Sequence, residues 1–141
     1  MKTHYSENEG AMMNRRQAEH RLAHEVGRVL AHTATDNLHW QGSRVDLIEA
    51  LHTAYTTFLL TDDEGVSLSF IHIVSQACSV LHVAMPSNPY ELAARGSRRK
   101  GLHSLPYMTR YLHRLQNSAE PLWEQIEKPA PADDSRLTVR G

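Results

Sequence analysis

Basic side chains gather in the stretch from Leu92 to Ala119, which contains no aspartate or glutamate. The chain has 15 Lys and Arg against 16 Asp and Glu, and six of these basic residues lie in that stretch, so nine basic and sixteen acidic residues remain outside it. Guanidinium and ammonium groups bind phosphate oxygens, and such a local excess is typical of proteins with an anionic partner, most often nucleic acid. The alternative is a solvated basic loop and helix face that binds nothing.

Two glycines bound the densest part of this stretch, Gly96-Ser97-Arg98-Arg99-Lys100-Gly101. Charges between glycines predict a mobile, exposed loop, and its arginines suit contact with DNA phosphates, which adds affinity and salt dependence without sequence choice. We therefore predict double-stranded DNA as the partner. The candidate DNA-binding residues are Arg95, Arg98, Arg99, Lys100, His103, Arg110 and Arg114.

Histidines supply a second candidate chemistry. His20 and His24 are four residues apart and share a helix face, with His32 near the same face, a geometry that zinc can use. No cysteine or HExxH motif lies nearby, and ten histidines in 141 residues give such a pair by chance. We expect no metal site; a zinc-dependent sensor is the weakest alternative and predicts zinc-dependent melting.

Motifs for enzymatic chemistry are missing. The sequence has no nucleotide-binding glycine motif and no nucleophile elbow. Cys78 stands in an apolar pattern without a base partner, and the acids of residues 62–64 lack the ligand spacing of a calcium loop. We expect a protein that is not an enzyme and uses no cofactor.

Apolar spacings of three and four residues predict helices over about 14–33, 44–60, 69–83, 89–95 and 105–117. Asn14, Ser43, Ser67 or Ser69, Asn88 and Ser104 are the expected N-caps, and Gly96 is expected to stop the fourth helix.

The helix over 44–60 has the strongest pattern, and we expect it to be the centre of the core. Its predicted inward stripe is Val45, Ile48, Leu51, Tyr55, Phe58 and Leu59, with Trp40 packed beside it. In the last helix Leu105, Met108, Leu112 and Leu115 are expected to point inward and Arg110, His113 and Arg114 elsewhere.

The organisation expected from these segments is one mostly α domain. Residues 1–13 form a flexible N-terminus, residues 14–128 a compact helical bundle with a helix-turn-helix or winged-helix-like C-terminal half, and residues 129–141 a disordered tail. The single cysteine suits a reducing compartment, and neither a signal peptide nor a membrane-spanning run is visible. We expect a cytoplasmic protein.

The central segment resembles a known family. Residues 40–49 read W-Q-G-S-R-V-D-L-I-E and are followed by Ala50-Leu51-His52. This is similar to the W-T-G-S-K-V-x-L-[IV]-E-L…A-L-H start of the C-terminal domain of RteC proteins, regulators carried on Bacteroidetes conjugative transposons. Gln41 replaces the usual threonine.

Later blocks resemble the same family in order and spacing, so that the likeness covers about residues 38–115. Ser69–Leu81 is similar to its apolar helix, and Tyr90 precedes Arg98-Arg99-Lys100 as a tyrosine precedes its R-x-R-K segment. Residues 104–112 resemble its T-x-F-L-x-x-L helix, with Pro106 as a departure.

The resemblance implies a winged-helix-like domain that binds DNA upstream of an excision operon and regulates transcription. The run Arg95–Lys100 would then grip phosphates between the last two helices. We expect a single helix, from about Asn14 to Thr33, in place of the family's larger N-terminal helical domain. The competing hypothesis is a non-enzymatic interaction module, which would use apolar faces to form a homodimer or to bind a regulatory protein.

Overall fold

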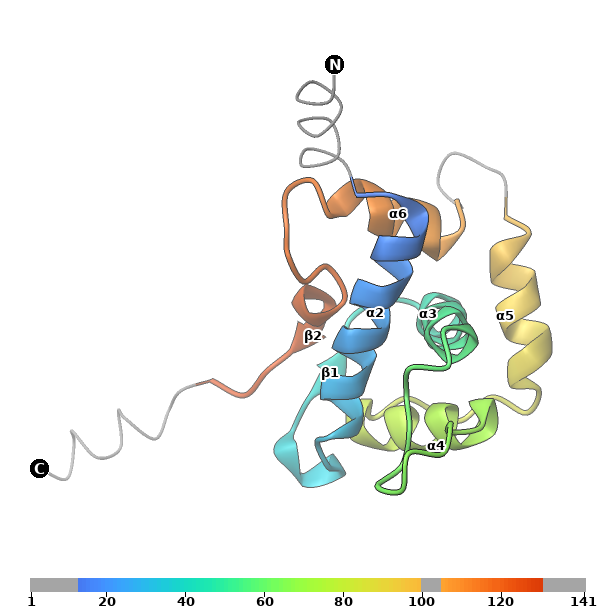
Figure 1. Cartoon of the computed structure of the whole chain (residues 1–141). Helices are drawn as coiled ribbons and strands as arrows, with labels where there is room; N and C mark the ends of the chain where they lie inside the picture. Colours follow the sequence, from blue (N-terminus) through green and yellow to red (C-terminus); the bar gives the residue numbers. More distant parts are fainter. Residues whose placement is uncertain (1–12, 100–104, 131–141) are drawn as a thin grey trace, which may run out of the picture.

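The structure is a computed structural model that describes residues 13–99 and 105–130. The described part of the chain is mostly helical, which confirms the expected mostly α, compact fold (Figure 1). Its elements are α2 (Arg15–Leu30), η1 (Ala34–Asp36), β1 (His39–Trp40), α3 (Arg44–Thr56), α4 (Phe70–Leu81), α5 (Pro89–Ser97), α6 (Tyr107–Arg114), η2 (Trp123–Gln125) and β2 (Ile126–Glu127). Most of the residues expected to form the flexible N-terminus and the tail lie outside the described ranges.

Short polar side chains start four of the helices, as the sequence predicts. Asn14 accepts a hydrogen bond from the backbone N–H of Gln17, whose side chain accepts one from Asn14 in return. Ser43, Ser69 and Asn88 each accept from the backbone N–H three residues later. These bonds satisfy N–H groups that have no partner within the helix, which fixes where each helix begins.

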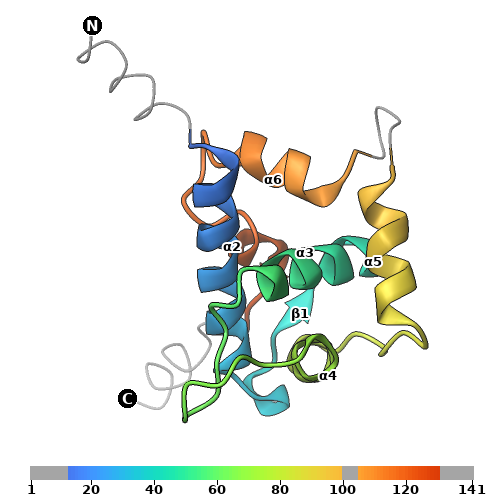
Figure 2. The ribbon, with the colours of Figure 1, turned by 45° about the vertical axis from the view of Figure 1, so that its right-hand side comes forward.

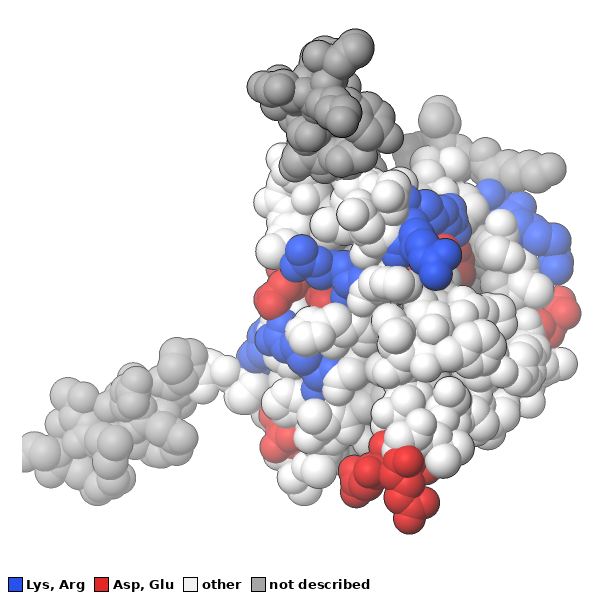
Figure 3. Space-filling model, in the orientation of Figure 1, with Lys and Arg blue, Asp and Glu red and all other residues white. Residues whose placement is uncertain are grey.

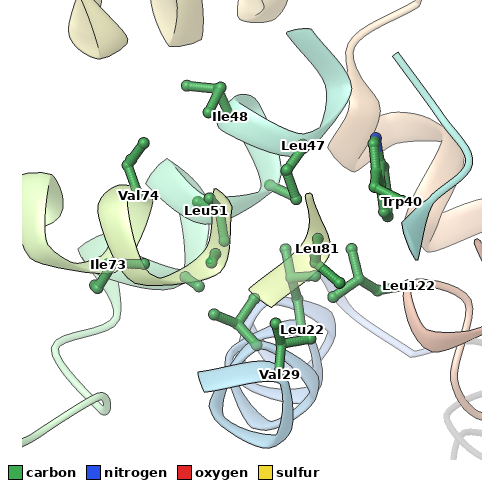
Figure 4. Close-up of a cluster of buried hydrophobic side chains, with 14 of the residues drawn as sticks. Leu22, Val29, Trp40, Leu47, Ile48, Leu51, Ile73, Val74, Leu81 and Leu122 are labelled. Atoms are coloured by element: carbon green, nitrogen blue, oxygen red, sulfur yellow. The ribbon is translucent and has the colours of Figure 1, made fainter. Parts of the chain in front are cut away.

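Helix α3 lies at the centre of the bundle and contacts α2, α4, α5 and α6 (Figures 1 and 2). Leu47, Ile48 and Leu51 of α3 are fully buried. Figure 4 shows them facing apolar side chains that come from α2, α4 and the C-terminal segment, namely Leu22, Val29, Ile73, Val74, Leu81 and Leu122. The prediction that this helix is the centre of the core is confirmed.

The C-terminal end of α3 differs from the prediction. The helix ends at Thr56, and Phe58 adopts a left-handed conformation with φ of 58°. The chain then turns into the connector to α4, and Phe58 and Leu59 are 61% and 53% exposed. Their assignment to the core is therefore wrong, because the helical period that placed them inward stops before them.

Gly96 does not stop α5, which continues to Ser97. The glycine is buried against α3, and a Cβ atom there would lie 2.6 Å from Glu49 Oε1 and 3.0 Å from Val45 Cγ1. Gly96 therefore serves the close approach of two helices rather than a helix end.

Two short strands join segments far apart in the sequence. β1 and β2 pair antiparallel, with Trp40 opposite Ile126. Trp40 is buried, as expected, and its indole N–H donates to the carbonyl of Ser43 at 2.8 Å. A short helical turn, η2, precedes β2, and Leu122 beside it is buried.

The last helix is shorter than predicted. It begins at Tyr107, after Pro106, and the expected cap Ser104 lies outside the described residues. Tyr107 and Tyr111 are fully buried together with Met108, whereas the leucines expected inward are only partly buried, namely Leu105, Leu112 and Leu115.

Replacing Ile48 or Leu51 by alanine removes fully buried methyl groups and leaves a cavity at the centre of the bundle. We expect each substitution to lower the free energy of unfolding by about 2–5 kcal/mol. Urea denaturation followed by circular dichroism measures this, with Phe58→Ala as the exposed control. A loss below about 1 kcal/mol for both core variants would show that α3 is not the centre of the core.

Candidate nucleic-acid interface

Two arginines of the predicted interface are held by carboxylates of α3. Asp46 is buried and accepts hydrogen bonds from Arg110 Nη2 at 2.6 Å and Nη1 at 3.1 Å, and from Arg99 Nη2 at 2.7 Å. Arg99 also contacts Glu49, a second buried carboxylate, with Nη2 and Oε1 3.3 Å apart. We call these four residues the ion cluster.

The ion cluster also holds the backbone on both sides of residues 100–104. Glu49 Oε2 accepts from the backbone N–H of Tyr107 at 2.8 Å, which fixes the start of α6. Arg99 donates through Nε to the carbonyl of Gly96, and Arg110 donates through Nε to that of Leu105. The end of α5 and the start of α6 are thereby tied to α3.

The pKa shifts agree with charged pairs. Burial acts to raise the pKa of Asp46, but hydrogen bonds and positive charge from Arg110 and Arg99 outweigh it, and the net pKa of Asp46 is lowered. The hydrogen bond to Asp46 raises the pKa of Arg110 in turn. Asp46 and Arg110 therefore carry opposite charges at neutral pH, and the arginines that contact the buried carboxylate balance its charge.

These contacts correct two expectations. The sequence predicts that Arg99 lies in an exposed loop and that Arg110 points away from the core, and both expectations are wrong. Each side chain is partly buried because it reaches back to carboxylates at the start of α3. Both arginines thus have a structural role in the described part of the protein.

Three of the predicted residues are exposed. Arg95 and Arg98 lie at the end of α5, and Arg114 closes α6. Arg98 lies 3.7 Å from Glu91, but both side chains are largely in solvent, so that pair is weak. Lys100 and His103 lie outside the described residues.

Helix α2 adds basic residues that lie outside the stretch from Leu92 to Ala119. Arg21 is exposed, and its Nη1 donates to the carbonyl of Ala119 at 3.4 Å, so it lies beside the segment that follows α6. Arg28, in contrast, pairs with Glu120 and stacks over the Trp123 ring. The sequence does show arginines clustered at residues 15, 16 and 21. They lie far from Leu92 in the sequence, so a search for local charge does not group them with the basic stretch.

Acidic side chains lie beside several of the basic ones on the surface, but one acidic group stands apart from them (Figure 3). In Figure 3 basic side chains lie over the regions of α2, α5 and α6, and an acidic group lies at the end where the connector between α3 and α4 turns. Asp62, Asp63 and Glu64 belong to this connector and are exposed. The half of the molecule that carries α6 is therefore the one suited to an anionic partner.

A buried glutamate of α2 binds both α6 and the segment that contains Trp123. Glu25 of α2 is fully buried, and its carboxylate accepts from the hydroxyl of Tyr111 at 2.5 Å and the backbone N–H of Trp123 at 2.7 Å. Burial raises the pKa of Glu25, although these hydrogen bonds act in the opposite direction. The glutamate thereby positions α6 against α2.

The histidines and Cys78 are the other residues with candidate chemistry in the sequence. They contain no group of three or more His, Cys, Asp or Glu that could hold a metal ion. Burial raises the pKa of the Cys78 thiol to about 11, which keeps it protonated and unreactive. No helix in the described ranges is long and apolar enough to cross a bilayer.

Comparisons with known proteins give no match. No protein-family model, curated protein or solved structure shows significant similarity to the chain.

The ion cluster predicts a pH-dependent stability. Asp46→Asn should lower the free energy of unfolding at pH 7 by about 2–3 kcal/mol, less than for a fully buried pair because both guanidinium groups are partly exposed. The folded pKa of Asp46 lies below its unfolded value of about 3.9, so its stabilisation is complete above that value and is lost as the pH falls toward the folded pKa.

Urea denaturation of both proteins between pH 7 and pH 3 measures this difference, which should shrink at the acid end. Asp63→Asn, an exposed acid of the α3–α4 connector, is the matched control and should change stability by less than about 0.5 kcal/mol. A difference that stays constant with pH would show that the charge of Asp46 does not stabilise the fold.

Proposed function

We propose that the protein is a DNA-binding transcriptional regulator of the RteC type, without enzymatic activity, which acts in the cytoplasm on the excision of a mobile element. The observation that carries the proposal is the division of the basic residues into two sets. The ion cluster uses Arg99 and Arg110, whereas Arg95, Arg98 and Arg114 are exposed in a segment without acids. The resemblance of residues 38–115 to the RteC C-terminal domain supports the same function.

The fold gives these exposed arginines a rigid base. The ion cluster fixes the end of α5 and the start of α6 on α3, so the arginines nearby need little ordering when DNA binds. Each phosphate that a guanidinium group neutralises releases condensed counterions, which favours binding at low salt. Contacts of this kind position a protein on the duplex without reading its sequence.

Fluorescence anisotropy with a labelled duplex of arbitrary sequence tests the proposal. We expect binding at low salt that weakens steeply as salt is added. Arg95→Ala, Arg98→Ala and Arg114→Ala should each weaken binding and reduce the slope of log affinity against log salt by about one if the residue contacts one phosphate.

Lys128→Ala is the matched control, because it removes one exposed positive charge from the C-terminal segment instead of from α5 or α6. It should leave the salt slope unchanged. A protein that binds no duplex at low salt, or variants on α5 and α6 that behave like Lys128→Ala, would contradict the proposal.

An aromatic surface favours a second candidate function, a dimerisation or protein-interaction module. The aromatic surface consists of Tyr55 of α3, Phe58 of the α3–α4 connector and Tyr90 of α5, which surround the buried Phe70 of α4. The ring centroids of Phe70 and Tyr90 are 4.7 Å apart, and those of Tyr55 and Phe58 are 5.8 Å apart. Phe58 is 61% exposed and Tyr90 is 51% exposed. Exposed aromatic groups of this kind are common at protein interfaces.

Sedimentation velocity over a range of protein concentrations tests this second function. If the aromatic surface forms a homodimer, the wild-type protein should sediment as a dimer at high concentration and Phe58→Ser as a monomer. Ile71→Ser, at another exposed apolar residue, serves as the control for a general change in solubility. A wild-type protein that stays monomeric at every concentration would exclude the homodimer.

A further inference from the structure

The outward face of α6 combines the properties of an element that reads DNA bases. The exposed side chains of this face and of the turn that follows α6 are polar and free of carboxylates, namely Thr109, His113, Arg114, Gln116 and Asn117, and the partly exposed Leu112 lies among them. From this face we infer that α6 enters the major groove of duplex DNA and contacts base edges there. The inference rests on the proposed function and adds the element and the side chains that would give sequence choice.

The opposite face of α6 fixes the helix firmly. Tyr107 and Tyr111 are fully buried, and the Tyr111 hydroxyl donates to Glu25 of α2. The backbone of Tyr107 is held by Glu49, and Arg110 is held by Asp46 of α3. Two buried carboxylates from α3 and one from α2 therefore set the orientation of the outward face, which gives a base-reading helix the rigidity that it needs.

The position of α6 in the bundle suits entry into a groove. Figure 2 shows α6 along one edge of the bundle, between α2 and α5. The major groove of B-DNA is about 12 Å wide and admits an α-helix, which is about 10–12 Å across with its side chains, and α6 has eight residues. The exposed Arg21 of α2 and Arg98 of α5 come from the two neighbouring helices, where phosphates on either side of a groove would lie.

The side chains on this face can form the contacts that discriminate bases. An arginine such as Arg114 can donate two hydrogen bonds to guanine, and the amides of Gln116 and Asn117 can pair with adenine. The exposed faces of the two neighbouring helices are less suited. α5 carries the exposed carboxylate of Glu91, and α2 carries Glu19 paired with Arg15. Negative groups there would oppose the phosphate charge.

Selection from a randomised duplex library by the full chain, followed by sequencing, provides the test. We expect one enriched sequence, and the affinity for it is then compared with that for a scrambled duplex of the same composition. Arg114→Lys keeps the charge but loses the planar pair of donors. It should reduce the ratio of the two affinities by roughly 5- to 150-fold.

Arg44→Lys is the matched control, because Arg44 is an exposed arginine outside the proposed DNA surface, and it should leave the ratio unchanged. Gln116→Ala and Asn117→Ala should alter the enriched sequence, and thermal melting checks that every variant is folded. Wild-type protein that binds duplexes but enriches no sequence would overturn the role of α6 and leave the proposed function standing. The role of α6 is also overturned if Arg114→Lys, Gln116→Ala and Asn117→Ala all keep the wild-type affinity ratio and the wild-type enriched sequence. Absence of binding to any duplex at low salt would overturn both.

Discussion

The pairing of two buried carboxylates of α3 with two arginines is the interaction on which the candidate interface depends. Asp46 and Glu49 lie in the helix that every other α-helix of the described bundle contacts. A buried carboxylate is costly without a cationic partner, and Arg99 and Arg110 supply that partner from the end of α5 and from α6. Two helices that meet α3 from different sides are thus fixed by one set of charges. The same pairing withdraws two positive charges from the surface, which leaves a smaller set of exposed cations than the sequence predicts.

Local signals in the sequence were sufficient for most of the fold. Caps such as Asn14 and Ser43 act within three residues, and the apolar period of α3 reports its buried face directly, so these predictions are confirmed. Signals that depend on distant partners were misread. Arg99 and Arg110 meet Asp46 across 53 and 64 positions in the sequence, and a count of charges by segment cannot show such a pair. Gly96 reads as a helix stop until its contact with Glu49 is known.

The two candidate surfaces lie at opposite ends of α5. Its first turn carries Tyr90, part of the aromatic surface, and its last turn leads to Arg95 and Arg98. DNA binding and association with a second protein would therefore use different parts of the molecule. A regulator of this kind could hold a duplex through α6 and still present its aromatic side chains to a partner. The two proposed functions are compatible in one molecule for this reason.

The most direct test of the central claim is an NMR titration of the ¹⁵N-labelled protein with a short duplex at low salt. The claim is that the exposed cations at the end of α5 and on α6 form the DNA surface, on a base fixed by the ion cluster. It predicts that amide signals of residues 95–99 and 107–117 shift with added DNA, together with those near Arg21, while those near Phe58 do not. Shifts centred on the aromatic surface, or no shifts at all, would contradict the account.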